Sequence, residues 1–300
     1  MYDALTEEHG ADAQWAFGTG IEDVQAEITS PVPDGVDPAD LAEYCLMLGD
    51  DALITSHRLS EWVSNAPELE EEVALANIAL DLLGQARILL SRAGHVEGLS
   101  SMAGSAGGGR DENALAYLRT EPQFRNVALA ELGDELDFAR AVARLLIFSS
   151  WRLAVLQRLL GSADPVLVAV AGKGVKELAY HRDYAARWTL RLGDGTDVSH
   201  AKMQDALERV WPYVEELFRA SDVERRLAAA GVAVDPADTR AEVDAVLDEV
   251  LAAATLTRPQ RPPIGTIAGR GGRQGVHTEQ LGHVLAEMQS LARQHPGATW

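Results

Sequence analysis

The sequence has little cysteine and few basic residues, and both shortages limit what the protein can do. Cys45 is the only cysteine among 300 residues. Neither an intrachain disulfide nor a cysteine-based metal site can therefore form, as expected in a reducing cytoplasm. Lysine and arginine number 26 against 46 aspartates and glutamates, which gives a formal net charge of −20. This charge would repel a nucleic acid or an anionic membrane, so we expect neither as a partner.

Long apolar runs and targeting signals are also missing. No stretch approaches the ~18–20 uninterrupted apolar residues that a membrane-spanning helix needs. Residues 1–25 are acidic and lack the basic-then-apolar pattern of a signal peptide. A hydrophobic fraction of 47% and a charged fraction of 24% are those of an ordinary globular protein. We therefore expect a cytoplasmic protein.

The chain does contain strong helical signals. Prolines stand at expected first helical positions, as in Asp37-Pro38 and Asp164-Pro165. Apolar residues recur three and four positions apart, and β-branched alternation is nearly absent. We predict long helices at 38–63, 68–92, 135–160, 165–191 and 198–219, and shorter ones at 111–119, 222–230, 236–254 and 278–294. Gly94 and Gly161 predict helix ends, and Pro212 predicts a kink or an early end in the fifth helix.

The order of these helices predicts the architecture. Tight turns near Asn65 and at 161–164 make two hairpins, and the crossover 93–134 joins them, which is the connectivity of ferritin-like bundles. We predict an all-α fold, a ferritin-like helical bundle with extra C-terminal helices. It forms a single domain over 37–300, with an insert loop at 98–110 and a C-terminal helical extension at 222–300. Residues 1–36 are predicted to be a flexible N-terminal arm.

Ferritin-like bundles can hold a di-iron centre through a recognisable ligand set. One carboxylate comes from each of two helices, and a Glu-x-x-His pair comes from each of the other two. The three-residue spacing puts both ligands on one helix face. This sequence contains no Glu-x-x-His, and its single Asp-x-x-His, Asp197 and His200, lies outside the predicted four-helix core. The expected ligand positions instead hold Leu82, Gln85, Ser149, Leu178 and His181.

These substitutions predict that the chain binds no metal, because Fe(II) prefers oxygen and imidazole donors to leucine and a neutral amide. His181 is either a vestigial ligand or a core histidine satisfied by a carboxylate such as Glu177, and we favour the second interpretation. Asp50, Asp51, His57 and Arg58 predict a structural polar network inside the bundle, with a small-ligand site as the alternative.

Other catalytic templates are absent. The sequence has no Gly-x-Ser-x-Gly elbow, no phosphate-cradling loop and no dinucleotide fingerprint. The run Gly269 to Gly272, with Gly275 close behind, is rich in glycine but follows no predicted strand. We therefore expect no nucleotide site there.

Seven stretches have an order and spacing that point to a known family: Leu48–Leu53, Arg58–Trp62, Ala66–Glu70, Ala76–Arg87, Arg191–Thr196, Gly275–Glu279 and Leu285–Gln289. Together they resemble the structural C-type subunits of the bacterial phenylacetyl-CoA epoxidases, which are multicomponent ring 1,2-epoxidases of phenylacetate degradation. The resemblance runs from about Leu41 to Trp300. It leaves out the N-terminal arm and the insert at 100–109.

The resemblance implies a non-catalytic structural role. Such a subunit lacks iron, pairs with a catalytic sister of the same fold that carries the di-iron centre, and helps to bind the CoA ester. A further small subunit and a reductase, which passes electrons from NADPH through flavin and an iron–sulfur cluster, complete the complex. The missing Glu-x-x-His pairs agree with this role.

The resemblance also implies substrate contacts in the crossover, at Gln123, Phe124, Arg125 and Asn126. Amide donors, a guanidinium for phosphate and an aromatic ring for adenine suit a CoA ester. A second candidate is the basic pair Arg225 and Arg226 with Leu227. The alternative for both is ordinary surface arginine beside packed apolar residues.

Two other functions stay open. The first is an active di-iron monooxygenase with an atypical ligand set drawn from Asp50, Asp51, Asp81, Glu177 and His181. Asp81 stands one residue from the expected position, which turns its side chain ~100° around the helix and makes it a poor ligand. The second is a helical interaction module unrelated to oxygenation. Iron content tests the first, and co-purification with a catalytic partner tests the second.

Overall fold

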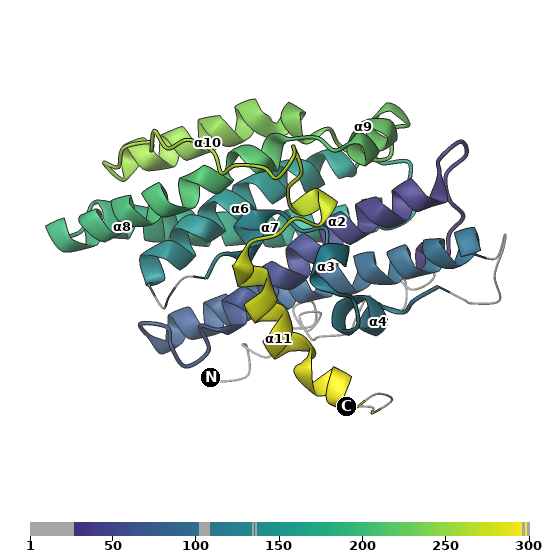
Figure 1. Cartoon of the computed structure of the whole chain (residues 1–300). Coiled ribbons are helices and arrows are strands. Elements are labelled where there is room, and N and C mark those ends of the chain that lie inside the picture. Colours follow the sequence, from purple (N-terminus) through teal and green to yellow (C-terminus); the bar gives the residue numbers. More distant parts are fainter. Residues whose placement is uncertain (1–26, 102–108, 134, 136, 296–297, 299–300) are drawn as a thin grey trace, which may run out of the picture.

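Four long helices form the bundle. The computed structural model describes residues 27–101, 109–133, 135, 137–295 and 298. The helices are α2 (Pro38–Ser60), α3 (Leu69–Ser101), α6 (Phe138–Leu159) and α7 (Pro165–Gly193) (Figure 1). α2 packs along α3, α6 packs along α7, and α3 contacts α7. Two hairpins joined by a crossover confirm the predicted all-α, ferritin-like bundle with extra C-terminal helices.

The predicted helix starts are confirmed by their caps. Asp37 accepts a hydrogen bond from the Ala39 amide at 2.9 Å, with Pro38 at the first helical position. Asp164 caps α7 in the same way and accepts from the amides of Val166 and Leu167. A side-chain acceptor satisfies amides that a helix N-terminus leaves without intrahelical partners, and proline costs nothing there.

The predicted end of the second helix at Gly94 is wrong. α3 continues through Gly94 to Ser101. A Cβ at Gly94 would lie 1.7 Å from the carbonyl oxygen of Arg110. The glycine is therefore needed for a close approach between α3 and the chain that returns after the insert, and it does not mark a stop. Residues 102–108 of the predicted insert loop lie outside the described residues.

Elements of the crossover and the C-terminal extension pack against all four bundle helices. The crossover contains α4 (Glu112–Tyr117), η2 (Glu121–Gln123) and α5 (Ala128–Glu131). α8 (Asp197–Val210) packs on α6 and α7, and η3 (Trp211–Tyr213), which contains Pro212, follows it as predicted. The remaining elements are η4 (Glu215–Phe218), α9 (Asp222–Ala229), η5 (Pro236–Thr239), α10 (Arg240–Ala253), η6 (Gly272–Gln274) and α11 (Glu279–Gln294). α11, yellow in Figure 1, crosses the bundle and contacts α2, α4 and α5.

The end of the predicted arm lies against α3. Arg92, fully buried, donates to the carbonyls of Ile28 and Ser30 at 2.9 and 2.5 Å and to the Asp164 carboxylate at 2.6 Å. This contact ties the chain before α2 to the start of α7. Residues 1–26 lie outside the described residues, so the arm and the domain boundary at residue 36 remain predictions.

α3 is unusually apolar for its length. Over Leu69–Leu99 it is long and apolar enough to cross a membrane by length and composition, the one such helix in the described part of the chain. Its inner face contains Leu75, Ile78 and Leu82, which are buried in the bundle core. Core packing therefore accounts for part of this apolar character.

Candidate functional site

The five positions expected to hold iron ligands all lie in the bundle interior. Leu82, Leu178, Ser149 and His181 are fully buried, and Gln85 is nearly so. The two leucines offer only carbon. The Ser149 hydroxyl already donates to the Leu145 carbonyl of its own helix at 2.6 Å.

A buried arginine reaches the amide at one of these positions. Arg152, fully buried on α6, donates from Nε to Gln85 Oε1 at 3.0 Å and from Nη1 to the Leu48 carbonyl at 3.1 Å. Gln85 Nε2 donates in turn to Glu177 Oε2 at 2.8 Å. Burial lowers the pKa of Arg152 to about 10, so the guanidinium stays charged at neutral pH. We call Gln85, Arg152, Glu177 and His181 the central cluster.

The partner of His181 differs from the prediction. Its Nε2 lies 3.0 Å from Asp81 Oδ2 on α3, whereas Glu177 was the expected neighbour. Asp81 lies at the contact between α3 and α7, where its partly exposed side chain reaches the imidazole. His181 Nδ1 is buried without a hydrogen-bond partner among the described residues.

These residues do not fit a di-iron centre. In the described part of the chain, no three His, Cys, Asp or Glu side chains gather in a way that could hold a metal ion. Asp81 pairs with His181, and Glu177 pairs with Gln85 and, at 3.3 Å, with Lys173. A fixed guanidinium beside them would repel a divalent cation.

A second polar group joins α2 to the crossover and the C-terminal tail. Asp50 and Arg119 are both buried and form a bidentate pair, with the second bond at 2.9 Å. The Arg125 amide also donates to Asp50 at 2.8 Å. The Arg119 guanidinium carbon lies 4.1 Å from the centre of the Phe124 ring.

The neighbouring aspartate binds the tail. Asp51 accepts from Arg273 at 3.1 and 2.9 Å and from the Val127 amide at 2.8 Å. Burial raises the pKa of the Asp51 carboxyl, and the charges of Arg273 and Arg152 oppose that shift. Arg273 also donates to the carbonyls of Met47 and Arg125 at 3.1 and 2.8 Å.

A third carboxylate completes this group. Glu131, fully buried, accepts from His277 Nδ1 at 2.6 Å and from the Thr278 amide at 2.7 Å. Arg58 Nε donates to the Glu131 carbonyl at 2.8 Å. We call Asp50, Asp51, Arg119, Glu131, Arg273 and His277 the tail network. Asp50, Asp51 and Arg58 thus belong to a buried polar network, as predicted, with partners that come from the crossover and the tail. His57 is only half-buried on α2.

The glycine-rich run Gly269–Gly275 lies where the C-terminal tail meets the crossover. A Cβ at Gly272 would lie 2.0 Å from the Asn126 carbonyl oxygen, and one at Gly275 would lie 2.2 Å from that of Pro122. Gly275 also has φ of 72°, a conformation in which glycine avoids the strain of a side chain. The glycines let the tail backbone touch the crossover backbone and leave room for Arg273 to enter the core.

The four predicted substrate contacts in the crossover differ in how exposed their side chains are. Phe124 and Asn126 are fully buried, and Asn126 donates to Glu131 at 2.9 Å. Gln123 is exposed, and its side chain accepts from the Thr120 amide at 2.8 Å. Arg125 is partly exposed and donates to the carbonyls of Pro122 and Phe124, both at 2.9 Å. Adenine stacking on Phe124 would require this segment to open.

The second predicted contact lies on α9. Leu227 is buried, whereas Arg225 and Arg226 are exposed. Arg226 binds Asp40 of α2 through two hydrogen bonds of 2.7 and 2.6 Å. Arg125 Nε lies 3.3 Å from Glu43, one turn further along α2. The structure therefore brings two of the predicted cations, 101 positions apart in the sequence, onto neighbouring turns of one helix, each already paired with a carboxylate.

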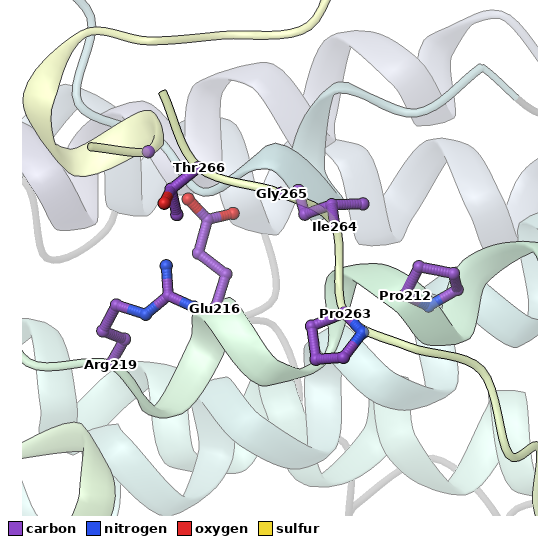
Figure 2. A pocket seen from close by; sticks show the side chains of 8 residues that line it. Pro212, Glu216, Arg219, Pro263, Ile264, Gly265 and Thr266 are labelled. Atoms are coloured by element: carbon purple, nitrogen blue, oxygen red, sulfur yellow. The ribbon is translucent and has the colours of Figure 1, made fainter. Parts of the chain in front are cut away.

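The described surface includes the following two hollows. The one in Figure 2 lies beside Glu216, Arg219 and the segment 263–266, and its cavity volume of about 10 Å³ holds about one water molecule. A shallow groove of about 280 Å³ runs between η2 and α11, lined by Thr120, Glu121, Gly282, Leu285, Ala286, Gln289, Ser290 and Arg293. Neither reaches the size typical of a site that encloses a whole drug-sized ligand.

Sequence reasoning missed the arginines that organise both polar groups. Arg152 could have been noticed, since it lies in the otherwise apolar run of α6 at a position whose neighbours face the core. A charge in such a run indicates a buried partner. Arg119 and Arg273 gave no comparable signal, because their partners on α2 are about 70 and 220 positions away.

Comparisons with known proteins agree with these observations. The model of a family described as phenylacetic acid catabolic protein matches residues 29–300. The chain is also 45% identical over 260 residues to the C-type subunit of the 1,2-phenylacetyl-CoA epoxidase of Escherichia coli (strain K12). That alignment covers 87% of this chain and 99% of the relative.

Proposed function

The chain belongs to the phenylacetic acid catabolic protein family, and from this premise we propose that it is a non-catalytic structural subunit of a multicomponent phenylacetyl-CoA 1,2-epoxidase. It pairs with a di-iron catalytic sister in the cytoplasm, alongside a further small subunit and a reductase that uses NADPH, flavin and an iron–sulfur cluster. It contacts neither nucleic acid nor membrane. The observation that carries the proposal is the central cluster, where Arg152 supplies a positive charge among positions that would otherwise hold ligands.

Iron analysis tests this role. The chain is expressed alone in iron-supplied cells, its iron is measured per chain, and it is then mixed with its catalytic sister. We expect no iron in the isolated chain and epoxidase activity only in the mixture. Two irons per isolated chain would contradict the proposal and support a monooxygenase with an atypical ligand set that includes residues such as Asp81, Glu177 and His181.

The CoA ester is the second part of the proposal. Arg125 and Arg226 lie against neighbouring turns of α2 and could exchange Glu43 and Asp40 for the phosphates of the ester. In the reconstituted complex, we expect Arg125→Ala and Arg226→Ala to raise KM for the ester with little change in kcat. Arg209→Ala is the matched control, because Arg209 is as exposed as Arg226, both at 57%, and pairs with Asp205 on α8. Equal KM values for all variants would remove substrate binding from these residues.

A further inference from the structure

Both ring nitrogens of His277 lie against hydrogen-bond acceptors. Nδ1 is 2.6 Å from Glu131 Oε1, and Nε2 is 3.1 Å from the Phe124 carbonyl oxygen. The side chains of His277 and Glu131 have no exposed surface. A neutral imidazole has one donor nitrogen and one acceptor nitrogen, so it would direct a lone pair at one of these acceptors. The two contacts are satisfied together only when two protons are available at the ring.

The contacts of Glu131 favour both protons on the ring. Oε2 accepts from the Thr278 amide and hydroxyl, both at 2.7 Å, and Oε1 also accepts from Asn126 Nδ2 at 2.9 Å. A carboxylate that accepts several hydrogen bonds is stabilised in its charged form. The proton between Oε1 and Nδ1 is therefore better placed on His277, as an imidazolium that donates to Glu131 and to Phe124 at once.

Two arginines lie near this pair but are bound elsewhere. Arg58 donates to the backbone carbonyl of Glu131 at 2.8 Å, and Arg273 binds the Asp51 carboxylate. Neither guanidinium bonds to the Glu131 carboxylate among the contacts of the described residues. A positive charge on His277 balances that carboxylate instead, and a buried charge is tolerated when it is paired and hydrogen-bonded.

Two further titratable groups face the same carboxylate. Burial raises the pKa of Glu216 on η4 and of Tyr213 on η3, and the charge of Glu131 adds to both shifts. Glu216 accepts from the amides of Ala128 and Gly272 at 2.8 and 2.9 Å. Negative charge is therefore concentrated here, and an imidazolium beside Glu131 reduces it.

The ring joins the C-terminal tail to the crossover. His277 follows η6 in the tail, Glu131 ends α5, and Phe124 follows η2. The next residue, Arg125, donates its amide to Asp50 of α2 at 2.8 Å. Loss of the Nε2 proton would leave two acceptors facing each other at 3.1 Å, so the Phe124 carbonyl would move away from the ring.

We propose that His277 is a buried imidazolium that fastens the crossover segment 123–126 to the C-terminal tail, and that loss of its second proton releases this segment. Raising the pH therefore loosens the segment, and lowering the pH tightens it. Because the segment contains the substrate contacts that the sequence predicts, the latch controls their exposure. The inference does not rest on the proposed function, since every contact that carries it lies within this chain.

The protonation state of the ring tests the first half of the proposal. The full chain is prepared with isotope-labelled histidine, and the ring-nitrogen signals are followed by NMR as the pH is raised. The His277 signals are assigned through their contacts with Thr278. We expect both nitrogens of His277 to be of the protonated type at about pH 7.5, above the ordinary value for histidine. A signal of the unprotonated type from His277 at that pH would overturn the proposal.

His277→Gln tests the second half. The glutamine amide has one donor group and one acceptor group at its two ends, so it cannot donate on both sides as the ring does. We expect hydrogen exchange at the amides of Arg125 and Val127, which bind aspartates of α2, to become about tenfold faster or more, as for the loss of a hydrogen bond from a charged donor. His283→Gln, at an exposed histidine of α11, should leave both rates unchanged.

Thr278→Val is the matched control inside the tail network. It removes a bond of 2.7 Å to Glu131 but leaves the ring and its contact with Phe124 in place. We expect exchange at the two crossover amides to stay close to the wild-type rates. Thermal melting of all the variants separates local release of the crossover from a general loss of stability.

Three results would overturn the latch. The first is wild-type exchange in folded His277→Gln, because the ring would then not hold the segment. The second is equal acceleration by Thr278→Val, because the effect would then come from the carboxylate and not from the Nε2 proton. If His277→Gln does not fold, the wild type decides: the amide signals of Arg125 and Val127 should shift with the same pH midpoint as the ring nitrogens, and a different midpoint is the third.

Discussion

The central cluster and the tail network lie in the same bundle, but their buried charges are satisfied very differently. In the tail network Asp50 meets Arg119 and Asp51 meets Arg273, and Glu131 is bound by His277, Thr278 and Asn126. In the central cluster Arg152 meets the Gln85 amide and a carbonyl. Arg152 Nη2 and His181 Nδ1 are buried there without a hydrogen-bond partner among the described residues, as is Asn126 Oδ1 beside the tail network.

The difference separates charge pairs that join segments far apart in the sequence from a polar cluster inside the four-helix core. The tail network connects α2 to segments about 70 to 220 positions later, so its loss would release the crossover and the tail. The central cluster connects neighbouring bundle helices that also share an extensive apolar core. Buried pairs are costly to break, whereas a buried charge with an incomplete set of partners can often be replaced by an apolar residue.

The largest effect is expected from Arg119→Ala. Asp50 would stay buried without its counter-ion, and Phe124 would lose the guanidinium that covers it. We expect the free energy of unfolding to fall by about 4 kcal/mol in chemical denaturation. The double variant Asp50→Leu/Arg119→Met should recover much of that loss, because no charge is then left unpaired. A loss below about 1 kcal/mol for Arg119→Ala would show that the tail network does not hold the fold together.

A somewhat smaller effect is expected from Arg273→Met. Asp51 would lose its bidentate partner but keep the Val127 amide at 2.8 Å and the nearby charge of Arg152. We expect a loss of about 3 kcal/mol and faster proteolysis between α10 and α11. Arg270→Met is the control, because Arg270 lies on the surface of the same segment. Proteolysis at the wild-type rate would mean that Arg273 does not anchor the tail.

A much smaller effect is expected from Arg152→Met, and this prediction tests the comparison directly. Methionine fills a similar volume and adapts to irregular packing. Gln85 can keep its bond to Glu177, and Asp51 keeps Arg273. We expect a change within about 1 kcal/mol in either direction. A loss as large as that of Arg119→Ala would show that the central cluster is held by charge as strongly as the tail network.

The long helices could be predicted from the sequence because their signals are local. Asp37 and Asp164 cap their helices as their positions before proline indicate. The predicted helix end at Gly94 was wrong because the sequence alone does not distinguish a glycine at a helix end from a glycine that allows two backbones to approach closely. Only the returning carbonyl of Arg110 distinguishes them.

The polar groups could be predicted only in part, because their partners are set by the tertiary fold. Burial of Asp50, Asp51 and Arg58 followed from their place on a largely apolar helix. That Asp51 meets Arg273 depends on how the glycine-rich tail passes over the crossover, which no local pattern encodes. The contact between Asp81 and His181 likewise depends on how α3 and α7 face each other, and periodicity along one helix cannot give that angle.

The smallest expected effect concerns His57, which precedes Arg58 beside the tail network and has no part in its ion pairs. Burial lowers the pKa of His57 from the ordinary 6.5. Below about pH 6.5 the unfolded chain therefore binds a proton that the folded chain resists, so the free energy of unfolding falls as the pH drops. We expect His57→Gln to lose less stability than the wild type between pH 7.5 and about 5.5. His283→Gln, at an exposed histidine of α11, should follow the wild type. If the stability of both variants falls with pH as that of the wild type does, the acid sensitivity arises from the paired carboxylates of the tail network and not from His57. The two polar regions would then also differ in their response to pH.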